Sequence, residues 1–176
     1  MLFFLRLLSA AALVLLAGCV TSGPSPAPVA AVDLTRYMGR WYVISHVPYF
    51  LERGKVASYD TYALRPDGRL TNNFTFREES LDGSEKTWQG VARVVAGTGN
   101  AKWKVSFLWP ISVTYKIYLI DSDYQWAVVG NDDASLLWVL ARERQIAPSR
   151  HESIERELRA KGIAIDKLTR VPQPAN

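Results

Sequence analysis

Residues 101–107 read AKWKVSF, a stretch that alternates apolar and polar side chains without interruption. Successive side chains of a β-strand point to opposite faces, so Trp103, Val105 and Phe107 fall on one face and the polar side chains on the other. The pattern predicts a strand with one buried and one solvated face.

Runs of β-branched and aromatic residues recur about every ten residues on both sides of this stretch, and turn-forming Gly, Asn and Asp separate them. The predicted strands are Arg40–Pro48, Ala57–Leu64, Arg69–Arg77, Lys86–Val95, Ala101–Trp109, Val113–Ile120, Trp126–Gly130 and Leu136–Arg142. A short further strand is expected over Ile163–Thr169. Eight consecutive strands with short connections favour an all-β fold, an eight-stranded antiparallel up-and-down barrel that closes to remove its edges.

One stretch near the C-terminus is typical of a helix. Ser149 and Glu152 have the spacing of a capping box, and Gly162 stands where the helix should end. Ile154 and Leu158 share one helix face because they are four residues apart. The apolar face predicts a single C-terminal α-helix packed on the outside of the barrel.

The interior of such a barrel can be filled by side chains or can hold one small ligand. On the predicted fourth strand, Gly90 and Ala92 share a face with the bulkier Trp88 and Val94. Small residues among large ones are compatible with open space. Periodicity alone leaves a ligand cavity and a solidly packed core as equal alternatives.

The N-terminus has the dimensions of a secretory signal, since Arg6 precedes an apolar run, Leu7–Ala17, that is too short to span a bilayer. Residues 16–19, LAGC, resemble a lipobox, and Cys19 is the only cysteine of the chain. The alternative is an ordinary signal peptide with an unrelated cysteine. We expect a lipoprotein signal peptide over residues 1–18 and acyl chains such as palmitate on Cys19, which would anchor the chain in a membrane. Val20 in place of Asp resembles the sorting signal for the outer membrane of the bacterial envelope.

Residues 19–31 are rich in Pro, Ser and Ala and are predicted to be a flexible tether, which leaves one domain over residues 32–176. The net charge of the 176-residue chain is +4. Such a charge suits nucleic acid or an anionic membrane surface, and the export signal argues against nucleic acid as a partner.

Three separated segments resemble the lipocalin family and stand in the family's order. They are residues 37–42 (YMGRWY), 121–127 (DSDYQWA, with Tyr124) and 137–142 (LWVLAR). The resemblance implies that Trp41 plugs the closed end of the barrel and that Gly39 lets the preceding turn pack tightly. It also implies that Arg142 crosses the barrel base beside Trp41, a cation–π contact worth about 1 kcal/mol.

Residues 52–54 (ERG) and 104–107 (KVSF) resemble the bacterial outer-membrane lipocalins, relatives of animal apolipoprotein D. This branch implies binding of fatty acids, lysophospholipids or similar lipids for storage, transport or membrane maintenance. By the same resemblance Tyr62 and Trp138 line the ligand cavity, and Tyr115 lies near its open end. Strand alternation adds as wall residues Phe74, Phe76, Trp103, Val105, Phe107 and Leu136.

The segment 108–114 departs from the pattern of the branch. Ser112 stands where relatives carry an aromatic residue, and Trp109 is a large residue without a counterpart in them. The mouth of the pocket is therefore expected to differ from that of the relatives.

Residues able to support catalysis are scarce, and we predict no enzyme, no metal site and no cofactor. His46 is expected at the rim of the barrel, and His151 is expected in solvent on the charged helix. Asp60 has the same strand parity as Tyr62, so it either points into the barrel or marks an irregularity of the strand register.

Two functions follow, and the sequence leaves the oligomeric state and the identity of any ligand open. The first is a membrane-anchored carrier of small lipids. The second is an envelope lipoprotein with a filled barrel that acts through its outer surface.

Overall fold

A computed structural model describes residues 25–175 of the chain. The predicted signal peptide and Cys19 lie outside the described residues. None of the helices within residues 25–175 is both long and apolar enough to cross a bilayer.

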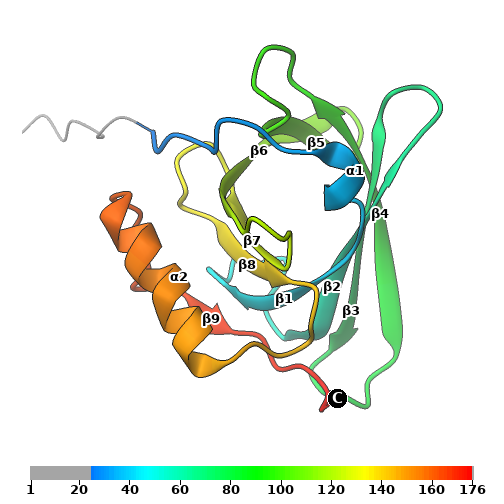
Figure 1. The fold of residues 1–176 in the computed structure, drawn as a ribbon. Coiled ribbons are helices and arrows are strands. Elements are labelled where there is room, and N and C mark those ends of the chain that lie inside the picture. Colours follow the sequence, from blue (N-terminus) through cyan, green and yellow to red (C-terminus); the bar gives the residue numbers. More distant parts are fainter. Residues whose placement is uncertain (1–24, 176) are drawn as a thin grey trace, which may run out of the picture.

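Nine antiparallel strands form one sheet that closes into a barrel (Figure 1). The strands are β1 Gly39–His46, β2 Lys55–Leu64, β3 Leu70–Glu78, β4 Glu85–Val94, β5 Lys102–Leu108, β6 Ile111–Ile120, β7 Trp126–Gly130, β8 Leu137–Ala141 and β9 Thr169–Arg170. Each of β2 to β7 pairs with the next strand along the chain, and β1 closes the barrel by pairing with both β2 and β8. The predicted eight-stranded up-and-down barrel is confirmed, and each of its strand boundaries lies within two residues of the prediction.

The strand expected over Ile163–Thr169 is wrong. Ile163 and Ile165 are buried beneath the C-terminal helix, and only the two residues of β9 pair with the edge of β1. An alternation of apolar residues in this segment reflects packing under a helix and not a strand ladder.

Helix α2, Pro148–Ala160, packs outside the barrel as predicted (Figure 1). Its buried Ile154 and Leu158 join a cluster with outward-facing residues of β1, β6, β7 and β8. The predicted capping box is wrong, because the helix begins at Pro148 after the N-cap residue Ala147, and no side chain caps it. Proline has no N–H to satisfy and already holds the helical φ, so Ser149 lies inside the first turn.

The barrel is closed at one end by a single guanidinium group. Arg142, just after β8, lies with its Cζ 3.8 Å from the centroid of the Trp41 ring. It donates hydrogen bonds to the carbonyl oxygens of Arg36 at 2.7 Å, Met38 at 2.9 Å and Arg40 at 2.8 Å. These contacts join β8 to β1 and to the short helix α1, Leu34–Tyr37, which precedes β1.

Two residues of the family segments fit around this closure. Gly39 has a φ of +98°, and a Cβ atom there would lie 3.3 Å from Nη1 of Arg142, so glycine meets both the backbone and the space requirement. Tyr124, in the β6–β7 loop, accepts a hydrogen bond from the backbone N–H of Asp33 at 2.7 Å, and its own carbonyl accepts one from Arg142.

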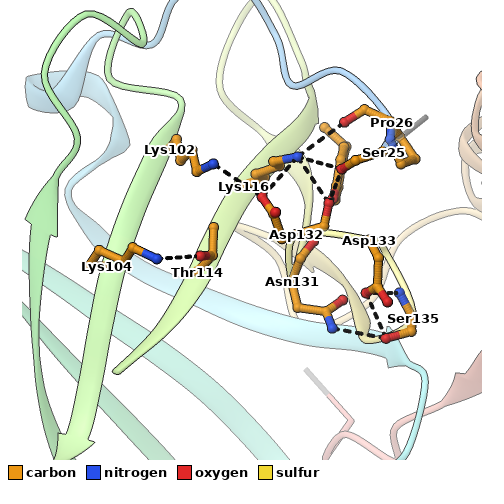
Figure 2. A network of polar contacts seen from close by, with 11 residues as sticks. Ser25, Pro26, Lys102, Lys104, Thr114, Lys116, Asn131, Asp132, Asp133 and Ser135 are labelled. Carbon is orange, nitrogen blue, oxygen red and sulfur yellow. Dashed lines mark hydrogen bonds and ion pairs between the residues drawn. The ribbon is translucent and has the colours of Figure 1, made fainter. Parts of the chain in front are cut away.

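Residues 25–32, called the strap below, run along the outside of the barrel from its open end to its closed end. The N–H groups of Val29 and Val32 donate to the carbonyls of Ile117 and Gly99 at 2.9 and 2.8 Å. The buried Lys116 donates to Ser25 Oγ at 2.7 Å and forms an ion pair with Asp132 at 3.0 Å (Figure 2). This part of the predicted tether is therefore docked on the barrel and is not free.

We expect Arg142→Ala to lower the free energy of unfolding by about 2 kcal/mol or more, because it leaves several carbonyls without a donor and removes the cation–π contact. Arg142→Lys keeps the charge but not the planar fork, and should recover only about half of the loss. Urea unfolding measures both variants, with Arg93→Ala on the exposed face of β4 as the control. An Arg142→Ala protein as stable as the Arg93→Ala protein would contradict the role given to the closure.

Candidate ligand-binding cavity

A cavity of about 380 Å³ lies inside the barrel at the end opposite Trp41 and Arg142. It is bordered by β2, β3, β5, β6, β7 and β8, and by the loop that joins β1 to β2. Its volume falls within the range of small-molecule sites, and most of its lining residues are apolar. The barrel is therefore not filled by its own side chains at this end.

Seven of the nine residues predicted to contact a ligand line this cavity. They are Tyr62, Phe74, Val105, Phe107, Tyr115, Leu136 and Trp138. They come from β2, β3, β5, β6 and β8 and from the residue just before β8. The sequence pattern thus assembles one wall from segments far apart in the chain.

The prediction that Phe76 and Trp103 line the cavity is wrong. Trp103 is fully buried below the cavity, where its ring stacks on Tyr115 with centroids 5.1 Å apart. Phe76 packs against Trp88 at 5.0 Å, with the ammonium of Lys55 4.3 Å from its ring centroid. Strand alternation gives the face on which a side chain lies but not its height along the barrel, which decides whether it meets the cavity or the packed core.

Three tyrosine hydroxyls meet at the inner end of the cavity. Tyr115 is hydrogen-bonded to Tyr37 at 3.1 Å and to Tyr62 at 2.9 Å. Burial raises the pKa of Tyr62 and of Tyr115 well above the usual value, so these phenols stay neutral. The inner end thus offers uncharged hydroxyl groups above a floor of aromatic rings.

Two carboxyl groups, Glu52 and Asp60, also line the cavity. Glu52 Oε2 accepts a hydrogen bond from Trp138 Nε1 at 2.9 Å and lies 2.7 Å from His46 Nδ1. Asp60 Oδ1 accepts one from the amide of Asn72 at 3.0 Å. Burial, and then the negative charge of Glu52, raise the pKa of Asp60 to about 7.

Both alternatives for Asp60 describe part of the structure. The pairing of β2 with β3 shifts its register between Val56 and Tyr59, and Ala57 has a positive φ of 51°. Beyond that bulge the alternation resumes with Asp60 and Tyr62 pointing into the barrel.

Sequence reasoning missed Glu52 and Asn72 as cavity residues. Asn72 has the same parity as Phe74 on β3, so alternation contained the signal for it. Glu52 lies in the loop between β1 and β2, where no period applies. Only the three-dimensional return of this loop over the barrel brings its carboxylate to the cavity.

The predictions for the two histidines need correction. His46, expected at the rim, lies at the end of β1 but is buried against Glu52. The expectation that His151 is solvated is wrong, because its Nε2 lies 2.9 Å from Ser45 Oγ and its Nδ1 lies 3.1 Å from Glu155. His151 shares the barrel-facing side of α2 with Ile154 and Leu158, a spacing that outweighs its polar neighbours.

The mouth of the cavity carries exposed apolar side chains, among them Phe50, Leu51, Phe107, Leu108, Trp109, Ile111 and Val113. Trp109, 87% exposed, is not part of the cavity lining, whereas Leu108 and Ile111 are. Gly90 does not leave open space, since a Cβ atom there would lie 2.7 Å from the ring of Phe107. Residue 90 is a glycine because the Phe107 ring packs directly against its backbone.

Within residues 25–175 no three His, Cys, Asp or Glu side chains converge in a way that could hold a metal ion. The cavity lining in the same part of the chain contains no Lys, Arg or His. The features left for recognition are apolar surface, neutral hydroxyls and two carboxyl groups.

Residues 32–173 match the family model described as a lipocalin-like domain. The chain belongs to the lipocalin family. The matched residues contain all three segments that resembled the family and every residue that lines the cavity. Membership supports a role in binding small hydrophobic ligands.

The lipocalin has relatives in bacteria, plants and animals. It is 33% identical over 131 residues to the outer membrane lipoprotein Blc of Vibrio cholerae, covering 73% of this chain and 75% of the relative. It is 31% identical over 154 residues to temperature-induced lipocalin-1 of Arabidopsis thaliana, covering 82% and 81%. It is 27% identical over 158 residues to mouse apolipoprotein D, covering 85% and 82%.

Solved structures place the lipocalin in the same fold. Insecticyanin of the tobacco hornworm Manduca sexta superposes with a TM-score of 0.68 at 16% identity, over 86% of both chains. Lobster apocrustacyanin A1 superposes with a TM-score of 0.64 at 13% identity, over 86% of this chain and 91% of the other. At these identities the likeness concerns the fold alone.

We expect Asp60→Asn to stabilise the protein by about 2 kcal/mol at about pH 8 and to have little effect at about pH 4. The pKa of Asp60 is 3.8 in the reference state and about 7 in the fold, so the folded wild type keeps a proton that the unfolded chain releases. The contribution of Asp60 to the stability of the wild type therefore falls as the pH rises from about 4 to about 7 and then levels off. Asparagine has no proton to lose, so the variant escapes this cost.

Urea unfolding at both pH values measures the difference. Asp82→Asn, an exposed carboxyl in the β3–β4 turn, is the control and should show none. Equal stability of the Asp60→Asn protein and the wild type at about pH 8 would show that Asp60 is not held in a buried, like-charged environment.

Proposed function

We propose that this lipocalin carries a single-chain lipid, such as a fatty acid, a lysophospholipid or a similar small apolar ligand, for storage, transport or membrane maintenance. The observation that carries the proposal is the open apolar cavity of about 380 Å³ beneath a mouth of exposed apolar side chains. The proposal assigns the protein no catalytic role.

Affinity in such a cavity comes from moving acyl methylenes out of water, about 0.8 kcal/mol for each that is fully buried. Phe74, Val105, Val129 and Leu136 supply apolar surface inside the cavity, and Leu108 extends it to the mouth. Because the strands hold these walls in place, little ordering is needed when a ligand enters.

The second part of the proposal is that acyl chains on Cys19 hold the barrel at the outer membrane of a bacterial envelope. The name of the Vibrio cholerae relative, an outer membrane lipoprotein, supports this location. Ser25, where the strap meets the barrel, lies only six positions after Cys19. Six residues reach at most about 20 Å.

The strap determines which end of the barrel this anchor would hold near the membrane. Ser25 contacts Lys116 and the carbonyl of Asp132 in the β7–β8 loop, beside Asn131 at the mouth (Figure 2). An anchor on Cys19 would therefore keep the open end, with its exposed Leu108 and Ile111, close to the lipid surface. A ligand could then pass between bilayer and cavity over a short aqueous distance.

The alternative function is an envelope lipoprotein with a filled barrel that acts through its outer surface. That reading needs a barrel plugged by its own side chains. The cavity volume and its apolar lining favour the carrier.

We expect delipidated protein to bind a fluorescent fatty acid and its tryptophan emission to be quenched, because Trp138 lines the cavity and Trp103 lies beneath it. Leu136→Trp places a larger ring in the cavity and should weaken binding by about tenfold or more. Leu64→Trp, at an exposed position near the closed end, is the matched control and should bind as the wild type does. Folded protein that takes up no lipid at saturation would refute the carrier function.

We expect Cys19→Ala to move the protein from the membrane pellet to the soluble fraction, because the acyl chains that hold it can no longer be attached. Val20→Ala keeps the cysteine and serves as the control. Fractionation, with mass spectrometry of the mature N-terminus, gives the result. An unmodified Cys19 in membrane-bound protein would contradict the anchor.

A further inference from the structure

The side chains that can carry a charge in the cavity lining are acidic. Glu52 and Asp60 are acidic, and no Lys, Arg or His belongs to the lining within the described residues 25–175. A cavity built to receive an anionic head group would be expected to present a cation or several N–H donors to it. This one presents carboxyl oxygens instead.

The two carboxyl groups differ in how far the protein itself compensates them. Glu52 Oε2 is held between His46 Nδ1 at 2.7 Å and Trp138 Nε1 at 2.9 Å. Asp60 receives a neutral amide hydrogen bond from Asn72 and has no basic side chain beside it in the cavity lining. Asp60 is therefore the group with acceptor capacity left for a ligand.

The polar and apolar groups are also separated along the cavity. Asp60 and Asn72 lie towards the inner end, next to the hydroxyls of Tyr62 and Tyr115. The mouth is formed largely by apolar side chains, including Leu51, Leu108, Ile111 and Val113. A ligand that matches this order places a compact polar end inside and its hydrocarbon chain towards the mouth.

We propose that the ligand is a single-chain amphiphile with a compact hydrogen-bond-donating or cationic end, such as a long-chain amine, and that Asp60 receives this end. The inference rests on the proposed carrier function and narrows its ligand class. An ammonium group donates to Asp60 and to the tyrosine oxygens and neutralises a buried charge. A fatty acid in its anionic form meets two carboxylates and is disfavoured.

The charge on Asp60 makes the preference for an amine over a fatty-acid anion depend on pH. The groups that face Asp60 are Glu52 and Tyr49 from the β1–β2 loop, Tyr62 on β2, Tyr37 on α1 and Tyr115 on β6, with His46 behind Glu52. Burial and Glu52 raise the pKa of Asp60 to about 7. Selection for an amine should therefore be strong above this pH and weaken below it.

The test compares dodecylamine, dodecanol and dodecanoate, which share one chain and differ in charge. Each displaces a neutral fluorescent probe from delipidated full-length protein below its micellar concentration. At about pH 8 the amine should bind about tenfold or more tightly than dodecanoate, with dodecanol between them. At about pH 6 the difference in affinity between dodecylamine and dodecanoate should shrink to about threefold or less.

Asp60→Asn should reduce the preference for dodecylamine over dodecanoate at about pH 8 to about threefold or less. Asp82→Asn, on the exposed β3–β4 turn, should keep the wild-type preference. The pH series on the wild type gives an answer even where a variant folds poorly. Dodecanoate binding as tightly as dodecylamine to the wild type at about pH 8 overturns the assignment, and so does an unchanged preference in Asp60→Asn. Absence of binding for all three chains, dodecanol included, overturns the carrier function itself.

Discussion

The closure made by Arg142 and Trp41 is the constraint on which the rest of the molecule depends. A sheet that curls into a barrel must be sealed at one end if the other end is to hold a ligand in the absence of bulk water. Here the Arg142 guanidinium lies against the Trp41 ring and donates hydrogen bonds to carbonyls of α1 and β1, so it joins the end of β8 to β1. With that end sealed, the opposite end of the barrel contains the open cavity of about 380 Å³.

Most of the architecture could be predicted from the sequence, because a two-residue period and turn-forming residues mark strands directly. The strands follow from patterns such as that of residues 101–107, and the outer helix follows from the four-residue spacing of Ile154 and Leu158. The height of each side chain along the barrel axis could not be predicted in the same way, because alternation fixes only the face of the sheet. Trp103 and Phe76 have the right parity but lie in the packed core, and Glu52 reaches the cavity from a loop without any period. His151 was misjudged because its polar neighbours hid its place on the buried face of α2.

The cavity combines a large apolar surface with a small polar region at its inner end. Family membership accounts for the apolar surface, since lipocalins bind small hydrophobic molecules. The pairing of Glu52 with His46 and Trp138, and the presence of Asp60 beside neutral tyrosines, are features of this chain's own residues. The strap adds a second constraint, because Lys116 and Asp132 hold Ser25, where the strap begins, at the open end.

Native mass spectrometry of the full-length protein, purified from its own cells in mild detergent, tests the existence of a bound ligand most directly. We expect one small amphiphile per chain, lost on delipidation and regained when a single-chain lipid is added back. A folded chain that is purified with nothing bound, and takes up nothing from excess lipid, would contradict the presence of a ligand site.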